Sequence, residues 1–114
     1  MIHFHLIFPD VIESLQHVRD IQRVHSKLIK SIRRTGLIAG RLYQATYLSH
    51  SELQLINSQA TTSDRVEQLL TILIKKPVEA YRCFLAALTK TNQEHIRNLL
   101  VKKGTDKALA SIQS

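Results

Sequence analysis

The sequence predicts an all-α fold, a six-helix antiparallel bundle, on three observations. Apolar residues make up 44% and charged residues 22% of the 114 residues, which are ordinary values for a globular domain. Only three glycines and two prolines occur, so the chain has few signals for sharp reversals. Apolar residues recur at helical spacing along most of the chain, whereas the alternation typical of strands is scarce. At this length we expect one domain with one core.

The longest predicted helix starts after Pro9 and runs to about Arg34. Its core side is formed by Val18, Ile21, His25, Leu28, Ile29 and Ile32. At about 100° per residue, a row of bases falls on roughly the opposite side, and Asp20 is the only acid within that row. This basic stripe consists of Arg19, Arg23, Lys27, Lys30 and Arg34. Gly36 is expected to end the helix as a C-terminal glycine.

The second helix is predicted from about Leu37 to Ala45. Its inward side is expected to consist of Ile38, Leu42 and Ala45. Ser49 is the expected N-cap of a third helix, because Ser49 and Glu52 have the spacing of a capping box. The apolar face of this third helix consists of Leu53 and Ile56.

The polar stretch NSQATTSD is the clearest loop, and Thr62 or Ser63 is expected to cap a fourth helix after it. Pro77 separates the fourth helix from the fifth, since proline is tolerated in the first turn of a helix. Asn92 is the expected cap of the sixth helix, which closes at Gly104. The predicted core side of these three helices consists of Val66, Leu69, Leu70, Leu73, Val78, Tyr81, Phe84, Leu85, Leu88, Ile96, Leu99 and Leu100.

The segments AYRCFLAAL and TNQEHIRNLL closely resemble the last two helices of the caspase recruitment domain (CARD) branch of the death-fold superfamily. The resemblance is strong over residues 65–100 and extends to LIKSIRRTG and YLSHSELQLI. It implies a death-fold bundle of the Greek-key type with a bent first helix, although no proline marks the bend. The predicted organisation is an N-terminal extension (1–15), a CARD-like domain (16–104) and a flexible tail (105–114).

The resemblance implies an interaction module rather than an enzyme, which recruits a partner CARD in cytoplasmic apoptotic or innate-immune signalling. CARD pairing sets a basic surface on the first and fourth helices against an acidic surface on the second and third. The basic surface carries over to Arg23, Lys27, Lys30, Arg34 and Arg65. The acidic surface is poor, because Glu52 is the only acid between residues 36 and 60. We therefore expect an acidic CARD partner (a caspase, a nucleotide-binding receptor or an adaptor) and only weak self-association.

The net charge of +7 leaves a second function open, that of a basic helical nucleic-acid-binding protein, because phosphate contacts need little beyond clustered Lys and Arg. No helix-turn-helix, zinc-finger or aromatic-platform pattern accompanies the charge, so this function ranks second. A solvated helix face without a partner is the third interpretation of the basic stripe.

We expect no catalytic, cofactor or metal site. The sequence has no nucleophile and base at suggestive spacing and no phosphate-cradling glycine loop, and its histidines form no ligand cluster. The single cysteine, Cys83, lies in an apolar helix and is expected to be a buried thiol in a reducing compartment. No apolar run is long enough for a transmembrane helix.

Overall fold

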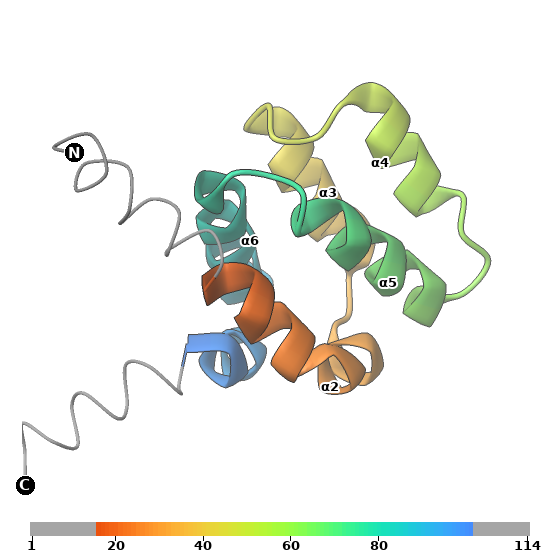
Figure 1. Cartoon of the computed structure of the whole chain (residues 1–114). Coiled ribbons are helices and arrows are strands. Elements are labelled where there is room, and N and C mark those ends of the chain that lie inside the picture. Colours follow the sequence, from red (N-terminus) through yellow and green to blue (C-terminus); the bar gives the residue numbers. More distant parts are fainter. Residues whose placement is uncertain (1–15, 102–114) are drawn as a thin grey trace, which may run out of the picture.

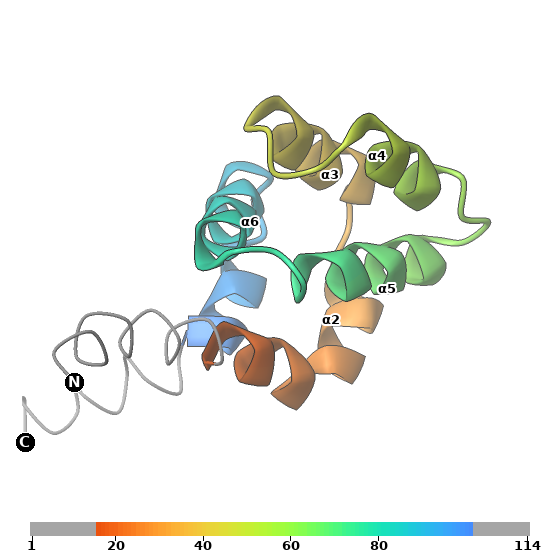
Figure 2. The ribbon, with the colours of Figure 1, turned by 45° about the horizontal axis from the view of Figure 1, so that its top comes forward.

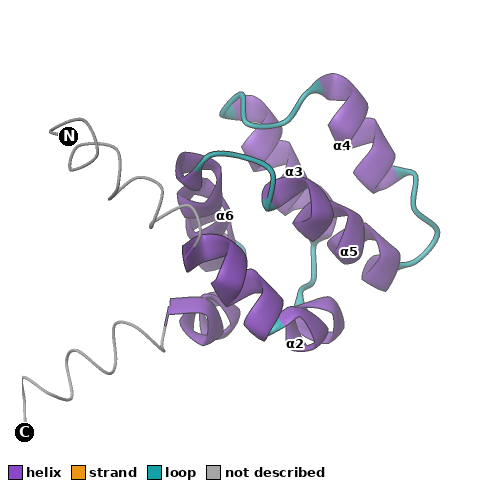
Figure 3. Ribbon diagram, viewed as in Figure 1, coloured by secondary structure: helices purple, strands orange, loops and turns teal. Residues whose placement is uncertain are grey.

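The computed structural model describes residues 16–101, and the prediction of an all-α bundle is confirmed over that range (Figures 1 and 3). The labelled helices are α2 (His25–Ser31), α3 (Thr35–Gln44), α4 (His50–Asn57), α5 (Thr62–Leu73) and α6 (Val78–Lys90). A first helix (residues 16–23) precedes α2, and a last helix (residues 94–101) follows α6. The predicted extension (1–15), the predicted tail (105–114) and Gly104 lie outside the described residues.

One apolar core fills the space between the helices. α3 packs against α4, α5 and α6, and α2 packs against α5. Figure 2 shows α3 and α4 above α5, with α2 below it and α6 at the left. The largest fully buried side chains are Phe84, Ile21, Leu28, Ile32, Ile38, Leu42, Ile56, Leu69, Leu70, Leu73, Leu88 and Ile96, all of them predicted for the core. Truncating one of these to alanine costs about 2–5 kcal/mol of stability.

The expected bend in the first predicted helix is found at Val24. This residue is non-helical (φ −112, ψ 19) and forms the N-cap position of α2. Its side chain is buried, as are those of Ile21 and Leu28 on either side of it. The Val24 carbonyl accepts a hydrogen bond from the Leu28 N–H at 2.9 Å, so the helical ladder resumes directly after the break. Burial of these three side chains keeps both halves on the core without a proline.

The prediction that this helix runs to Arg34 and ends at Gly36 is wrong. α2 ends at Ser31, and Ile32 continues as extended chain (φ −68, ψ 131). Arg34 is left-handed (φ 57, ψ 41) and stands before the first residue of α3, so Gly36 lies inside the first turn of α3. The side chain of Ile32 is fully buried. Core packing of the link therefore overrides the glycine signal.

The ends of α3 and α6 share one motif, which corrects two predictions. After α6, Asn92 is left-handed (φ 62), and the N–H of Gln93 donates to the Leu88 carbonyl at 2.7 Å. Asn92 therefore ends α6 in a Schellman motif and does not cap the last helix. Thr46 (φ 69) ends α3 in the same way, which leaves Ala45 at the C-cap and exposed, not facing inward as predicted.

The cap of α5 is one residue earlier than predicted. Thr61 is the N-cap, and its Oγ1 accepts a hydrogen bond from the Asp64 N–H at 3.0 Å. Thr62 and Ser63 lie inside the helix, so neither caps it. Residue type could not select among three consecutive hydroxyl side chains, because Ser and Thr are both good N-caps. Pro77 stands at the N-cap of α6, between the two helices that it was predicted to separate.

Candidate interaction surface

The basic stripe follows the first helix, α2 and the link to α3. Arg19 and Arg23 lie on the first helix, Lys27 and Lys30 lie on α2, and Arg34 lies in the link. All five residues are exposed. The break at Val24 therefore leaves the whole stripe on the surface, because both halves keep their apolar sides on the core.

Lys27 and Lys30 are the residues of the stripe that are most available to a partner protein. Within residues 16–101, neither ammonium group makes a hydrogen bond or an ion pair. The two residues are three positions apart on α2, so their side chains are neighbours on one helix face. A partner that brings two carboxylates to this face could pair with both lysines without breaking an existing ion pair of either one.

Arg23 has a structural role as well as an exposed charge. Its Nη2 donates to the carbonyls of Leu99 and Leu100 at 3.3 and 3.4 Å and lies 3.8 Å from the Asp20 carboxylate. Each of these bonds joins a guanidinium donor to a backbone acceptor 76 or 77 residues away. Arg23 thus ties the first helix to the last one, and only part of its donor capacity faces solvent.

Arg65 is likewise engaged inside the molecule. It is half-buried on α5, and its Nε donates to the carbonyl of Gln59 at 3.1 Å, which fixes the loop before that helix. α5 packs against α2, so Arg65 belongs to a helix next to the basic stripe. The structure therefore places all five predicted bases on two packed helices, the first helix and one link.

Glu52, predicted as the single acid of the receptor side, is occupied by two other partners. Its Oε1 accepts the N–H of Ser49 at 2.8 Å, while Ser49 Oγ accepts the Glu52 N–H at 3.1 Å, which confirms the predicted capping box. The same oxygen lies 2.9 Å from Nζ of Lys76. Burial acts to raise the pKa of Glu52, but the bonds from Lys76 and Ser49 outweigh it, so the pKa is lowered. The carboxylate is charged and already paired.

Exposed apolar side chains occur on both α3 and α4. Leu37, Tyr43 and Leu55 are the large exposed apolar residues of the described chain, at 58%, 40% and 45% exposure. The resemblance implied an acidic surface on these helices. That this side is a poor acidic receptor stays a prediction.

Two residues that were given no role in the sequence analysis make contacts with the predicted interaction region. Lys76 neutralises Glu52 from a position 24 residues away. Gln93 is buried and bonds to the main chain of Arg33, beside the end of the basic stripe. The signal for Gln93 was present in the sequence, since it is the glutamine of the TNQEH element. No local pattern marks Lys76, because its contact joins two separate elements.

Among residues 16–101, no group of three or more His, Cys, Asp and Glu side chains could hold a metal ion. None of the helices in that range has the length and apolar character to cross a membrane. Cys83 is half-buried and not fully buried as predicted; burial raises the pKa of its thiol against a smaller opposing effect of Arg41. A raised pKa makes a thiol a poor nucleophile.

The sequence model of the family described as "Caspase recruitment domain" matches residues 19–103. No curated protein matches the chain. The matched range contains the residues predicted for the interaction, which are Arg23, Lys27, Lys30, Arg34, Glu52 and Arg65.

Proposed function

Since the chain belongs to the caspase recruitment domain family, whose members are homotypic protein-interaction modules of apoptotic and immune signalling, we propose that it recruits a partner CARD through its basic stripe. Lys27 and Lys30 form the centre of the contact. Arg23, Arg34 and Arg65 extend it. The partner presents an acidic surface, and recruitment raises the local concentration of the effector attached to that partner. The site of action is the cytoplasm.

The observation that supports this proposal is that two exposed cations have no partner among residues 16–101. The ammonium groups of Lys27 and Lys30 have no internal partner within the described chain. Two unit charges 4 Å apart attract by about 1 kcal/mol in bulk water and about 4 kcal/mol near a protein surface. Complementary charges of this kind set partner choice and association rate more than affinity.

A partner of opposite charge is favoured over a second copy of this chain. Self-association through the same pairing would need an acidic receptor on α3 and α4. The only acid from residue 36 to residue 60 is Glu52, which already pairs with Lys76 at 2.9 Å. A second copy would also bring the same net charge of +7. We therefore propose a heterotypic complex and weak self-association.

Nucleic-acid binding is the second candidate function, because the stripe and the net charge of +7 suit a phosphate backbone. The two functions differ in what a duplex should do. A phosphate-binding surface takes up a generic duplex with an affinity that falls steeply as salt rises. A CARD-docking surface has no such affinity beyond weak nonspecific contact.

Sedimentation velocity over a concentration and salt series tests the proposal. The protein is run alone, with a short DNA duplex, and with a panel of CARDs whose second and third helices are acidic. We expect a monomer alone, no duplex complex at physiological salt, and a complex with at least one acidic CARD. A salt-resistant homopolymer at micromolar concentration would contradict the heterotypic preference. Tight duplex binding would replace the first candidate function by the second.

A further inference from the structure

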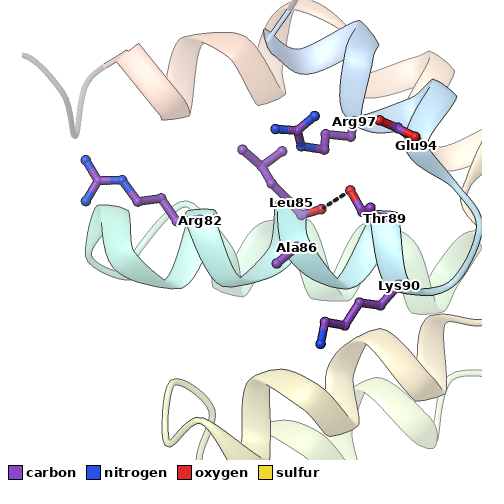
Figure 4. A pocket seen from close by; sticks show the side chains of 7 residues that line it. All are labelled: Arg82, Leu85, Ala86, Thr89, Lys90, Glu94 and Arg97. Atoms are coloured by element: carbon purple, nitrogen blue, oxygen red, sulfur yellow. Dashed lines mark hydrogen bonds between the residues drawn. The ribbon is translucent and has the colours of Figure 1, made fainter.

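A groove with a volume of about 560 Å³ lies between the outer side of α6 and the last helix (Figure 4). The α6 residues that line it are Arg82, Leu85, Ala86, Thr89 and Lys90. The last helix contributes Glu94 and Arg97. None of these residues belongs to the basic stripe, although Arg82 and Leu85 also border a smaller pocket with Gln16, His17 and Asp20 of the first helix.

Charge and apolar surface are combined in this groove. Figure 4 shows Arg82 and Lys90 at opposite ends of the α6 segment, with Arg97 reaching in from the last helix. Among the described residues that line it, Glu94 is the one acid, against the cations Lys90 and Arg97. Between the cations lie the side chains of Leu85 and Ala86. A ligand that fits must therefore carry negative charge at its edges and apolar surface in the middle.

A second groove of about 320 Å³ flanks α6 on the side of α3. It is lined by residues of α3 and α6 that include Arg41 and Cys83, and it shares Ala86 and Lys90 with the first groove. Ala86 is exposed and small, so it forms a low crest between the two hollows. The two grooves and the low ridge between them form a surface on which a further helix can pack, since the side-chain ridges of one helix fit the grooves of another.

We infer that the outer side of α6 is a second docking surface, which takes an acidic amphipathic helix of a partner protein. The apolar stripe of that helix lies over Ala86 and Leu85. Carboxylates on one border of that helix meet Arg41 and Lys90, on the side of α3 (Figure 4). Those on the other border meet Arg97. Amphipathic helices bind grooves in this manner through apolar anchors at helical spacing. A nucleic acid would use the cations but leave the apolar floor unmatched.

This inference goes beyond the proposed function and does not rest on it. Together with the basic stripe, the chain would then have two surfaces, on different helices, that each bind an acidic segment of a partner protein. One partner with two acidic segments, or two partners, could then be held together. Joining two weak contacts in this way raises overall affinity without any new contact.

The experiment is an amide-resolved NMR titration of the isotope-labelled full chain with a defined peptide. The probe is an amphipathic helix of about 18 residues, roughly 27 Å long, with a Leu/Ala stripe bordered by glutamates. A matched peptide carries glutamine at each glutamate. We expect the acidic peptide to shift amides of α6 and the last helix, and the glutamine peptide to bind about tenfold more weakly or worse.

Charge-reversal variants locate the site. Lys90→Glu and Arg97→Glu, both outside the core, should each lower the affinity for the acidic peptide by about tenfold. Lys30→Glu on α2 should change this affinity by less than about twofold. The dispersion of the amide spectrum shows directly that each variant is folded. Cys83 gives a second readout, because a helix seated across both grooves should slow alkylation of this single thiol.

Several results would overturn the inference. These are no binding at millimolar peptide, equal affinity for the two peptides, or shifts confined to α2 that Lys30→Glu abolishes. A DNA duplex that shifts the same α6 amides as strongly as the peptide would make the groove a phosphate site. Concentration-dependent shifts of these amides in the protein alone would make the occupant a second copy. Unchanged alkylation of Cys83 in the peptide complex would exclude a helix across both grooves.

Discussion

The side chain of Gln93 pairs with the main chain of Arg33 in both directions. The Arg33 N–H donates to Oε1 of Gln93 at 2.7 Å, and Nε2 of Gln93 donates to the Arg33 carbonyl at 2.7 Å, across 60 residues of sequence. Gln93 is 5% exposed and also donates to Thr91 Oγ1 at 2.8 Å. An extended link has no helical partners for its backbone, so this side chain supplies them. Gln93 thereby holds the segment between Lys30 and Arg34 on the bundle.

Replacing Gln93 by alanine should lower the free energy of unfolding by about 1–3 kcal/mol, because it removes two partly buried hydrogen bonds to the main chain of Arg33. Gln93→Glu should also destabilise, since it keeps the acceptor for the Arg33 N–H but loses the donor to the Arg33 carbonyl. Urea unfolding at neutral pH measures both. The matched control is Asn98→Ala, an exposed position on the last helix, which should change stability by less than about 0.5 kcal/mol. A Gln93→Ala protein as stable as the control would contradict the role of this pair.

His17 should make the protein less stable in mild acid. The ring is 3% exposed, packs 5.2 Å from the Tyr81 ring, and has no hydrogen-bond partner for either nitrogen among the described residues. Burial lowers the pKa of His17 below its ordinary 6.5, against a smaller opposing effect of Asp20. The unfolded chain therefore binds a proton that the folded chain resists, and stability falls as pH drops below about 6.5.

His17→Phe tests this dependence, since it keeps an aromatic ring beside Tyr81 and removes the titration. Urea midpoints are compared at about pH 7.5 and about pH 5. We expect the natural protein to lose more stability over this interval than the variant. The exposed His50→Phe serves as the control and should retain the full dependence of the natural protein. Equal losses in the natural protein and His17→Phe would show that another group carries the effect.

Glu52 offers a pair of substitutions that separates its two roles. Glu52→Gln keeps an acceptor for the Ser49 N–H but removes the charge that faces Lys76, and Glu52→Ala removes both. Loss of the cap contact should cost about 1 kcal/mol, with an upper limit of about 2 kcal/mol. The partly exposed ion pair contributes less than about 1 kcal/mol. We therefore expect Glu52→Ala to be the less stable variant in thermal or urea unfolding.

Glu52 should also make the stability of the protein depend on pH, in a more acidic range than His17 does. The pKa of Glu52 is lowered from its ordinary 4.5, so its contribution to stability is complete above that value and declines as pH falls toward the folded-state pKa. Glu52→Gln should flatten the stability profile below about pH 4.5, whereas Glu67→Gln at an exposed position of α5 should not. An unchanged profile in Glu52→Gln would mean that the pairing with Lys76 is not maintained in solution.

Local signals in the sequence predicted the local features of the fold. Helical spacing of apolar residues identified the core, and Ser49 with Glu52 identified a capping box. Pro77 marked the boundary between α5 and α6. These features depend on residues within four or five positions of one another, which a single sequence shows directly.

The features that sequence reasoning missed depend on contacts between distant segments. Gly36 failed to mark a helix end because buried Ile32 and the pairing with Gln93 hold the link extended. Arg23 and Arg65 were predicted only as surface charges, yet each bonds to backbone carbonyls outside its own helix. Asn92 fits both a helix start and a left-handed helix end, and only the closure of α6 selects the second.

The most direct test of the central claim is a charge swap between Lys27 and Lys30 and the acidic partner CARD that sedimentation identifies. Lys27→Glu with Lys30→Glu should weaken the complex by about 10- to 100-fold in calorimetry, and Lys75→Glu, an exposed control at the end of α5, by less than about twofold. Replacing the matching partner acids by lysine should restore most of the lost affinity. A double variant that binds as well as the control, or a loss that no reversal on the partner restores, would contradict recruitment through the basic stripe.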